Sequence, residues 1–295
     1  MVLEHLFPEE WLERKFYYAF VLGAGYSVIG ILLARFLFAA DPALPAVAFT
    51  SLFLLPELYK LFSIEERQQS RDSSFGMRTF WRDNADFFRV YLMIFVGILL
   101  VYCLAAMLLP AFSVNALFRE QIEMRGGGFS AAGYATLAGD ASGQSQFLSI
   151  LKNNFFVMLA CFAVALLAGD GAIFFITWNA SVWGTIFGIT ARNAAFFSQG
   201  APLKFFLLVF TIVLPHMLLE ATSYILAAMA GGLISKGALR EGLNGKRFAR
   251  VFKDNIFILI LALTALVIGA TVESIVLSQS DTYREIIVAS YRALG

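Results

Sequence analysis

The residues best suited to chemistry lie inside an apolar stretch between Lys204 and Lys236. Its middle contains Pro215, His216 and, four positions later, Glu220. A charged side chain at bilayer depth costs about 2.5–3.5 kcal/mol even on insertion scales, so such residues usually face a bundle interior or a water-filled cavity. Because His216 and Glu220 are four apart, they share one helix face and could pair. This pair could lock helix packing, handle protons or cations, or contact a headgroup or partner.

Other polar side chains occur in further apolar segments of the chain. Asn153, Asn154 and Asn179 could bridge helices through hydrogen bonds worth about 0.6–2 kcal/mol each. Glu273, near the end of the last apolar segment, could join an internal polar cluster or reach the interface, and we favour the interface. Asp170 lies between two glycines and is interpreted as a turn residue.

Small residues recur at a spacing that is typical of close helix packing. Residues three or four apart share a helix face, and small ones there let two backbones approach. The residues in these stripes are Ala180, Gly184 and Gly188, then Ala227 with Gly231, and Ala228 with Gly232. We therefore expect tight packing in the bundle and a homodimer.

Proline at position 215 cannot donate a backbone hydrogen bond, and its ring clashes one turn back. We therefore predict that the helix containing His216 and Glu220 bends or breaks near residues 211–215.

The motifs of common membrane enzymes are missing from the sequence. There is no His-Glu-x-x-His pattern, and the chain has only two histidines, His5 and His216, which argues against a metal site. Cys103 and Cys161 both fall in apolar segments and read as small buried side chains. Asp170 has no second intramembrane aspartate to form a protease dyad. We therefore expect no enzyme activity, no metal and no cofactor.

The composition places these residues in a membrane protein. Hydrophobic residues make up 59% of the chain and charged residues 15%, against about 25% charged in soluble domains. The mean hydropathy is +0.75. No basic patch with interleaved aromatic residues indicates a nucleic-acid partner. We predict an all-α, polytopic transmembrane bundle of about seven segments. About 20 apolar residues are needed to cross the bilayer, and strong candidates lie at 16–38, 88–110, 153–169, 171–190, 204–235 and 255–278.

The seventh segment, 45–62, is apolar only over its first part and could span or be re-entrant. Lys and Arg residues gather between positions 60 and 89 and between 236 and 253. If segment 45–62 spans, both groups fall on the side of Arg14 and Lys15, which the excess of positive charge makes cytoplasmic. We therefore favour spanning. The protein is then a multi-pass cell-membrane protein with a cytoplasmic N-terminus and an extracytoplasmic C-terminus.

Three regions follow from this pattern: an N-terminal segment pair with a basic loop (1–86), a five-span membrane domain (87–278) and an extracytoplasmic tail (279–295). The largest outer loop, 111–152, has a helix-like stretch at 115–124 and then a glycine-rich run beginning at Gly126. The glycines predict a flexible connection.

The order of these features resembles the stage II sporulation protein M family of integral membrane proteins. The resemblance covers about 87–278, and its most specific part is Pro215, His216 and Glu220 within an apolar helix. Two positions differ from the family pattern, because Met217 and Ala180 stand where glycine is usual.

The resemblance implies a non-enzymatic membrane scaffold, since family members in spore formers are associated with cell-wall-degrading partners during engulfment. We therefore expect contact with membrane lipids and with extracytoplasmic or membrane protein partners. The alternative is a transporter, channel or lipid-handling permease that uses His216 and Glu220, because helices interrupted at the bilayer midplane are typical of transporters.

Overall fold

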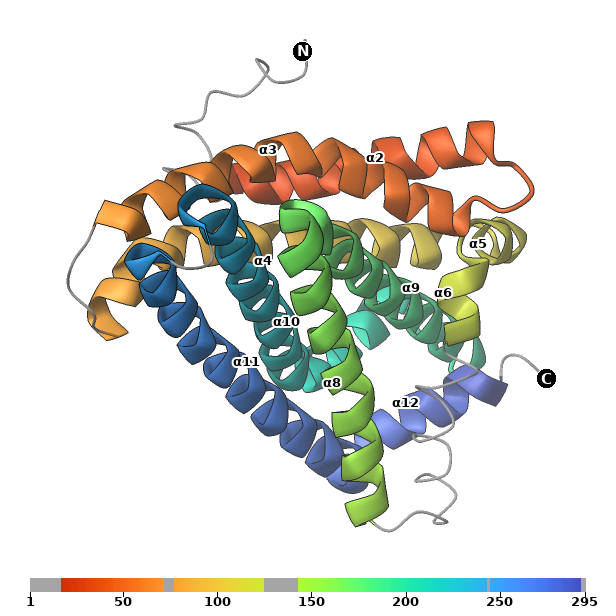
Figure 1. Cartoon of the computed structure of the whole chain (residues 1–295). Helices are drawn as coiled ribbons and strands as arrows, with labels where there is room; N and C mark the ends of the chain where they lie inside the picture. Colours follow the sequence, from red (N-terminus) through yellow and green to blue (C-terminus); the bar gives the residue numbers. More distant parts are fainter. Residues whose placement is uncertain (1–16, 72–76, 125–142, 243–244, 293–295) are drawn as a thin grey trace.

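The computed structural model describes residues 17–71, 77–124, 143–242 and 245–292 (Figure 1). Arg14, Lys15 and the glycine run at 126–128 lie outside these residues. Every regular element in the described ranges is helical, which confirms the predicted all-α class. The elements are α2 (Tyr17–Leu37), α3 (Ala43–Arg71), α4 (Met77–Leu108), α5 (Ala111–Leu117), α6 (Arg119–Met124), α8 (Gly143–Ala168), η3 (Gly169–Ala172), α9 (Ile173–Phe197), α10 (Pro202–Glu241), α11 (Lys246–Gln279) and α12 (Asp281–Arg292).

Five stretches of the described chain are long and apolar enough to cross a membrane. They are Tyr17–Leu37, Ala85–Leu108, Gln146–Phe197, Pro202–Leu239 and Phe248–Gln279. The third contains two helices, α8 and α9, which are joined by the short 3-10 turn η3. Ala43–Tyr59, within α3, is apolar but shorter. This pattern confirms a polytopic helical membrane protein.

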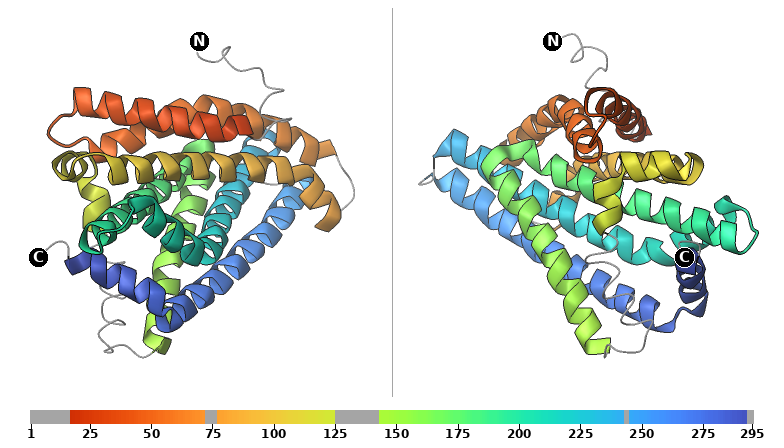
Figure 2. Two further views of the ribbon diagram at one scale, coloured as in Figure 1. Left: turned by 180° about the vertical axis from the view of Figure 1, so that it is seen from behind. Right: turned by 90° about the vertical axis from the view of Figure 1, so that its right-hand side faces the viewer.

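Helices α2, α3 and α4 form one layer, and Figures 1 and 2 show them packed along one side of the bundle. Glycines allow their backbones to approach closely. A Cβ atom on Gly23 of α2 would lie 2.5 Å from the carbonyl oxygen of Ile94 in α4, and one on Gly97 would collide with the backbone of α2 at Phe20. Any side chain at these positions would push α2 and α4 apart.

Helix α9 is the central helix of the bundle and packs against α4, α10, α6 and α12. Its stripe of small residues lies against α4, because Cβ atoms on Gly184 and Gly188 would collide with the carbonyl oxygens of Leu99 and Cys103. Ala180 is fully buried on the same helix. This stripe therefore packs closely, as predicted, and it does so against another helix of the same chain.

The second stripe, on α10, is also used within the chain. A Cβ atom on Gly231 would collide with the carbonyl oxygen of Phe162 in α8. The neighbouring Gly232 is buried as well. Neither glycine stripe is therefore left free to form a homodimer.

Helix α10 continues from Pro202 to Glu241 with Pro215 inside it, so of the predicted bend or break near residues 211–215 the break does not occur. Proline removes one helical hydrogen bond, but a break would leave several backbone groups without partners. Because unsatisfied backbone groups are costly in hydrocarbon, membrane helices tolerate an internal proline more readily than a break.

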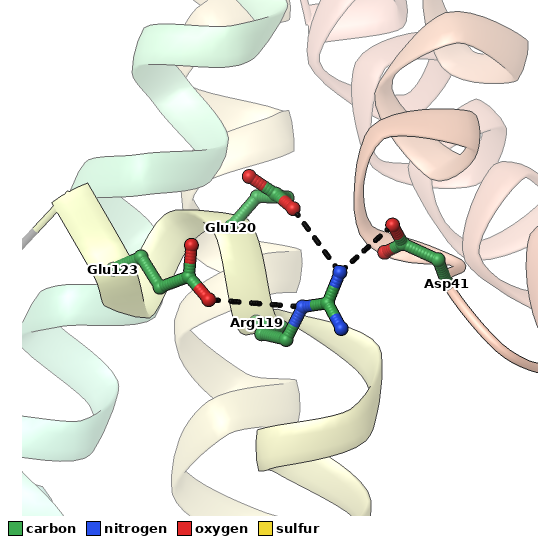
Figure 3. A network of polar contacts seen from close by, with 4 residues as sticks. All are labelled: Asp41, Arg119, Glu120 and Glu123. Carbon is green, nitrogen blue, oxygen red and sulfur yellow. Dashed lines mark hydrogen bonds and ion pairs between the residues drawn. The ribbon is translucent and has the colours of Figure 1, made fainter.

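Helix α3 is one continuous helix beside α2, so segment 45–62 is not a re-entrant loop. An exposed ion pair between α6 and the α2–α3 turn shows which elements lie beside the start of α3 (Figure 3). Arg119 Nη2 at the start of α6 lies 3.0 Å from Asp41 Oδ2 in the α2–α3 turn. The α2–α3 turn therefore lies near α6, which follows the C-terminal end of α4. This arrangement is expected if α3 runs back across the bundle from that turn.

Three short helices cover this same end of the bundle. Helices α5 and α6 follow α4, α12 follows α11, and both α6 and α12 pack against α9 (Figure 1). We refer to α5, α6 and α12 together as the platform.

Candidate functional site

The candidate site lies where three long helices, α8, α10 and α11, pack together. Helices α10 and α11 form an antiparallel pair that is connected through residues 242–245. Gly269 of α11 faces Glu220 of α10, since a Cβ atom there would lie 3.3 Å from Glu220 Cγ and 3.2 Å from Leu219 Cβ. This close approach brings the next turn of α11, which carries Glu273, to the polar face of α10.

Glu220 and Glu273 form a buried carboxyl pair. Their exposed fractions are 1% and 4%, and their side chains interact with each other. The Asn154 side chain, from α8, interacts with Glu220 as well. Glu273 therefore belongs to the internal cluster, and the interfacial position that we favoured from the sequence is wrong. The reason is the register between α10 and α11, which turns Glu273 inward.

Asn154 is the hydrogen-bonding centre of the cluster. Its Oδ1 accepts a hydrogen bond from the Tyr224 hydroxyl at 3.0 Å and one from Asn153 Nδ2 at 3.3 Å. Asn154 is buried, whereas Asn153 is exposed on the outside of α8. The predicted bridging between helices is therefore present at Asn154, which connects α8 to α10.

His216 lies one turn before Glu220 on α10 and is 5% exposed. Its Nδ1 has no hydrogen-bond partner in the described part of the chain. Glu220 instead interacts with Glu273 and Asn154, so the predicted pair of His216 with Glu220 is replaced by a pair between helices. Pro215, the residue before His216, is on an exposed side of α10.

Asn179 does not reach this cluster through any hydrogen bond seen in the described residues. Its Nδ2 donates to the carbonyl oxygen of Phe175 in its own helix at 2.8 Å. The amide is therefore satisfied locally.

A second polar group lies at the opposite end of α8. Asp170, in the turn η3, is 5% exposed, and its Oδ1 lies 3.7 Å from Lys236 Nζ of α10. Lys236 Nζ also stands 4.7 Å from the ring centre of Tyr59 in α3. Asp170 is a turn residue, as predicted, but it also connects the turn to α10. The sequence analysis missed this pair because the two residues are far apart in the chain.

Two polar contacts that local patterns do not reveal stabilise this end of the bundle, one between the platform and α9 and one between α9 and the end of α4. Gln121 Nε2 of α6 donates to Ser181 Oγ of α9 at 3.4 Å, and both side chains are fully buried. Arg192 Nη1 of α9 donates to the carbonyl oxygens of Ala106 and Leu109 at 3.1 and 3.3 Å. A cation at these carbonyls satisfies the end of α4 and complements its dipole.

No three His, Cys, Asp or Glu side chains gather as metal ligands within the described ranges. The free thiols, Cys103 and Cys161, are buried on different helices. The groups that this cluster offers are therefore two carboxyl groups, an imidazole, amides and hydroxyls, and the chemistry open to them is hydrogen bonding and proton binding.

The family profile described as stage II sporulation protein M matches residues 19–276. The chain belongs to this family. The match includes α3 and all of α2 except its first two residues, and the resemblance seen in the sequence had left both helices outside its five-span core. The polar cluster and the Asp170–Lys236 pair also fall within it. No curated protein and no solved structure matches the chain.

Membership of the stage II sporulation protein M family agrees with the helical architecture, and the protein is an integral membrane protein. The matched region ends three residues after Glu273, so α12 lies beyond it.

Proposed function

We propose that this protein is a non-enzymatic membrane scaffold that holds partners of a cell-envelope or membrane-remodelling complex on its platform. The attachment of the platform to the bundle carries this proposal. Gln121 fixes α6 to α9, Arg192 fixes the end of α4, and α12 packs along α9. A scaffold requires a surface whose shape is set before a partner arrives, since ordering a loose segment on binding reduces affinity.

The platform also presents side chains suited to a protein partner. Phe112 of α5 is 81% exposed, and the Glu123 side chain of α6 is 64% exposed. Exposed aromatic residues are enriched at binding hot spots. We assign the platform to the extracytoplasmic side, because the basic stretches 60–71, 77–89, 236–241 and 246–253 belong to helix ends at the other end of the bundle (Figure 1) and favour the cytoplasm.

Co-purification from native membranes in mild detergent tests the scaffold role. Glu123→Lys reverses a charge on the platform, and Asp86→Lys makes the same change on α4, near the opposite end of the bundle. The two sites are matched, because each carboxylate is exposed and pairs with an arginine, Arg119 and Arg89 respectively. A stoichiometric partner that is lost only from Glu123→Lys supports the proposal. The absence of any partner from the wild-type protein contradicts it.

A homodimer remains part of this proposal, but it has to use other surfaces than the glycine stripes. Gly184, Gly188 and Gly231 already pack against helices of their own chain. Crosslinking of the purified protein reports whether two copies associate.

A second candidate function is transport of an ion, solute or lipid, and the buried carboxyl pair favours it. Ionisable residues within membrane bundles commonly line transport pathways. Glu220→Gln would then abolish a flux in liposomes while the protein stays folded. A wild-type protein that moves no ion, lipid or solute would count against transport and leave the scaffold role unaffected.

A further inference from the structure

We propose that the Glu220–Glu273 pair is a proton-binding site that exchanges its proton with the aqueous phase beside Asn153 and Asn154. This goes beyond the scaffold role and does not depend on it. Two carboxyl groups lie together in a bundle interior. Two negative charges so placed repel strongly, and buried acid pairs resolve this by sharing a proton.

Within the described ranges, no lysine or arginine is among the groups that interact with the pair. Helix α10 contributes His216 and Tyr224, α8 contributes Asn154 and Cys161, and α11 contributes Glu273 itself. The one charged residue of α9 is Arg192, whose Nη1 hydrogen bonds go to the carbonyl oxygens at the end of α4. A proton is therefore the simplest means of neutralising the pair.

A second observation, independent of the carboxyl pair, points to a small exchangeable ligand. His216 Nδ1 and Ser223 Oγ are both buried and have no hydrogen-bond partner among the described residues. They lie four positions before and three positions after Glu220, so both flank it on one face of α10. Glu220 Oε1 and Glu273 Oε2 are likewise unpartnered.

Each buried polar atom without a partner costs about 1–3 kcal/mol. Three such atoms on one face of α10, together with Glu273 Oε2 on α11, therefore form an unusual concentration of unmet hydrogen-bonding capacity. Protons and water molecules satisfy donors and acceptors of this kind and can come and go. A metal ion fits less well, because these side chains do not gather as a group of three metal ligands.

The route for exchange follows the amides of α8. Asn153 is exposed and donates to Asn154, which is buried and interacts with Glu220. During release, the O–H bond of the protonated carboxyl group breaks, its electron pair stays on the carboxylate, and the proton leaves on water. The Asn154 N–H group can then donate to the carboxylate that remains. The reverse steps restore the proton.

Infrared difference spectroscopy of the protein in lipid nanodiscs tests this inference. The protonated carboxyl C=O band is recorded as pH is stepped, and its shift after transfer to deuterium oxide gives the exchange rate. We expect a carboxyl band in the wild-type protein that is lost in both Glu220→Gln and Glu273→Gln. Circular dichroism and a single elution peak confirm that each variant is folded.

The route is tested by one further variant and a matched control. Asn154→Leu removes the amide beside Glu220 and should slow deuterium exchange of the band by about tenfold, which is about 1.4 kcal/mol in the barrier. Asn179→Leu removes a membrane amide whose hydrogen bond is local, and should leave the rate unchanged. A wild-type protein without the band, a band that survives both glutamine variants, or equal slowing by the two leucine variants would overturn the proposal.

Discussion

Replacement of Gly184 by alanine should destabilise the bundle, because the added methyl group has no room between α9 and α4. The new Cβ would collide with the Leu99 carbonyl oxygen and lie 2.9 Å from Tyr102 Cβ and 3.1 Å from Cys103 N. Carbon atoms in normal contact are about 3.5–4.0 Å apart. Two of these three obstacles are backbone atoms, so the helices themselves must separate.

The magnitude follows from two opposing effects. Overpacking of a tight interface costs about 1–3 kcal/mol. Alanine also gains about 0.5–1 kcal/mol over glycine within a helix. The net loss in the free energy of unfolding for Gly184→Ala is therefore about 0–2.5 kcal/mol. To isolate the steric cost, the variant is compared with a glycine-to-alanine change that gains helix propensity but meets no neighbouring atom.

Gly25→Ala is that control, because no atom lies within 4 Å of a Cβ atom at this exposed position of α2. Unfolding by sodium dodecyl sulfate in mixed micelles, followed by circular dichroism, measures both variants. We expect Gly184→Ala to be less stable than Gly25→Ala by about 1–3 kcal/mol. Equal stability of the two variants would refute the close crossing of α4 and α9.

Three further predictions concern polar contacts. Lys236→Met alone removes the cation beside the buried Asp170 and should cost about 3–5 kcal/mol, and the double variant with Asp170→Asn should recover most of it in a double-mutant cycle. Tyr224→Phe removes the hydrogen bond to Asn154 and should cost about 0.6–1.7 kcal/mol in the same unfolding assay. Arg119→Ala removes three exposed ion pairs, with Asp41, Glu120 and Glu123, and should cost less than about 1 kcal/mol, with the difference shrinking as salt is added.

The sequence predicted the apolar core of each long helix well, because about 20 apolar residues are a strong signal. It predicted the ends less well. Helix α4 begins at Met77, well before the predicted 88, and α8 begins at Gly143 rather than 153. Hydropathy falls where a helix leaves hydrocarbon, but its backbone hydrogen bonds continue. Helix α12 was missed because it is amphipathic and contains no long apolar run.

The candidate site was predicted in part. Burial of Glu220 and His216 followed from their apolar surroundings, since polar side chains at bilayer depth turn inward. The partner of Glu220 did not follow, because Glu273 is brought to it by the packing of α11 at Gly269, and local spacing carries no information about such a contact. The same holds for Asp170 with Lys236. Residues four apart were predicted to pair, whereas the contacts that define the site join different helices.

Chemical crosslinking in intact membranes, followed by mass spectrometry of the crosslinked peptides, tests the scaffold role most directly. If the account is right, a second protein is crosslinked in stoichiometric amount, and its crosslinks map to α5, α6 and α12. Crosslinks that occur only within the chain, or a partner whose crosslinks are confined to the end of the bundle near Asp170 and Lys236, would contradict it.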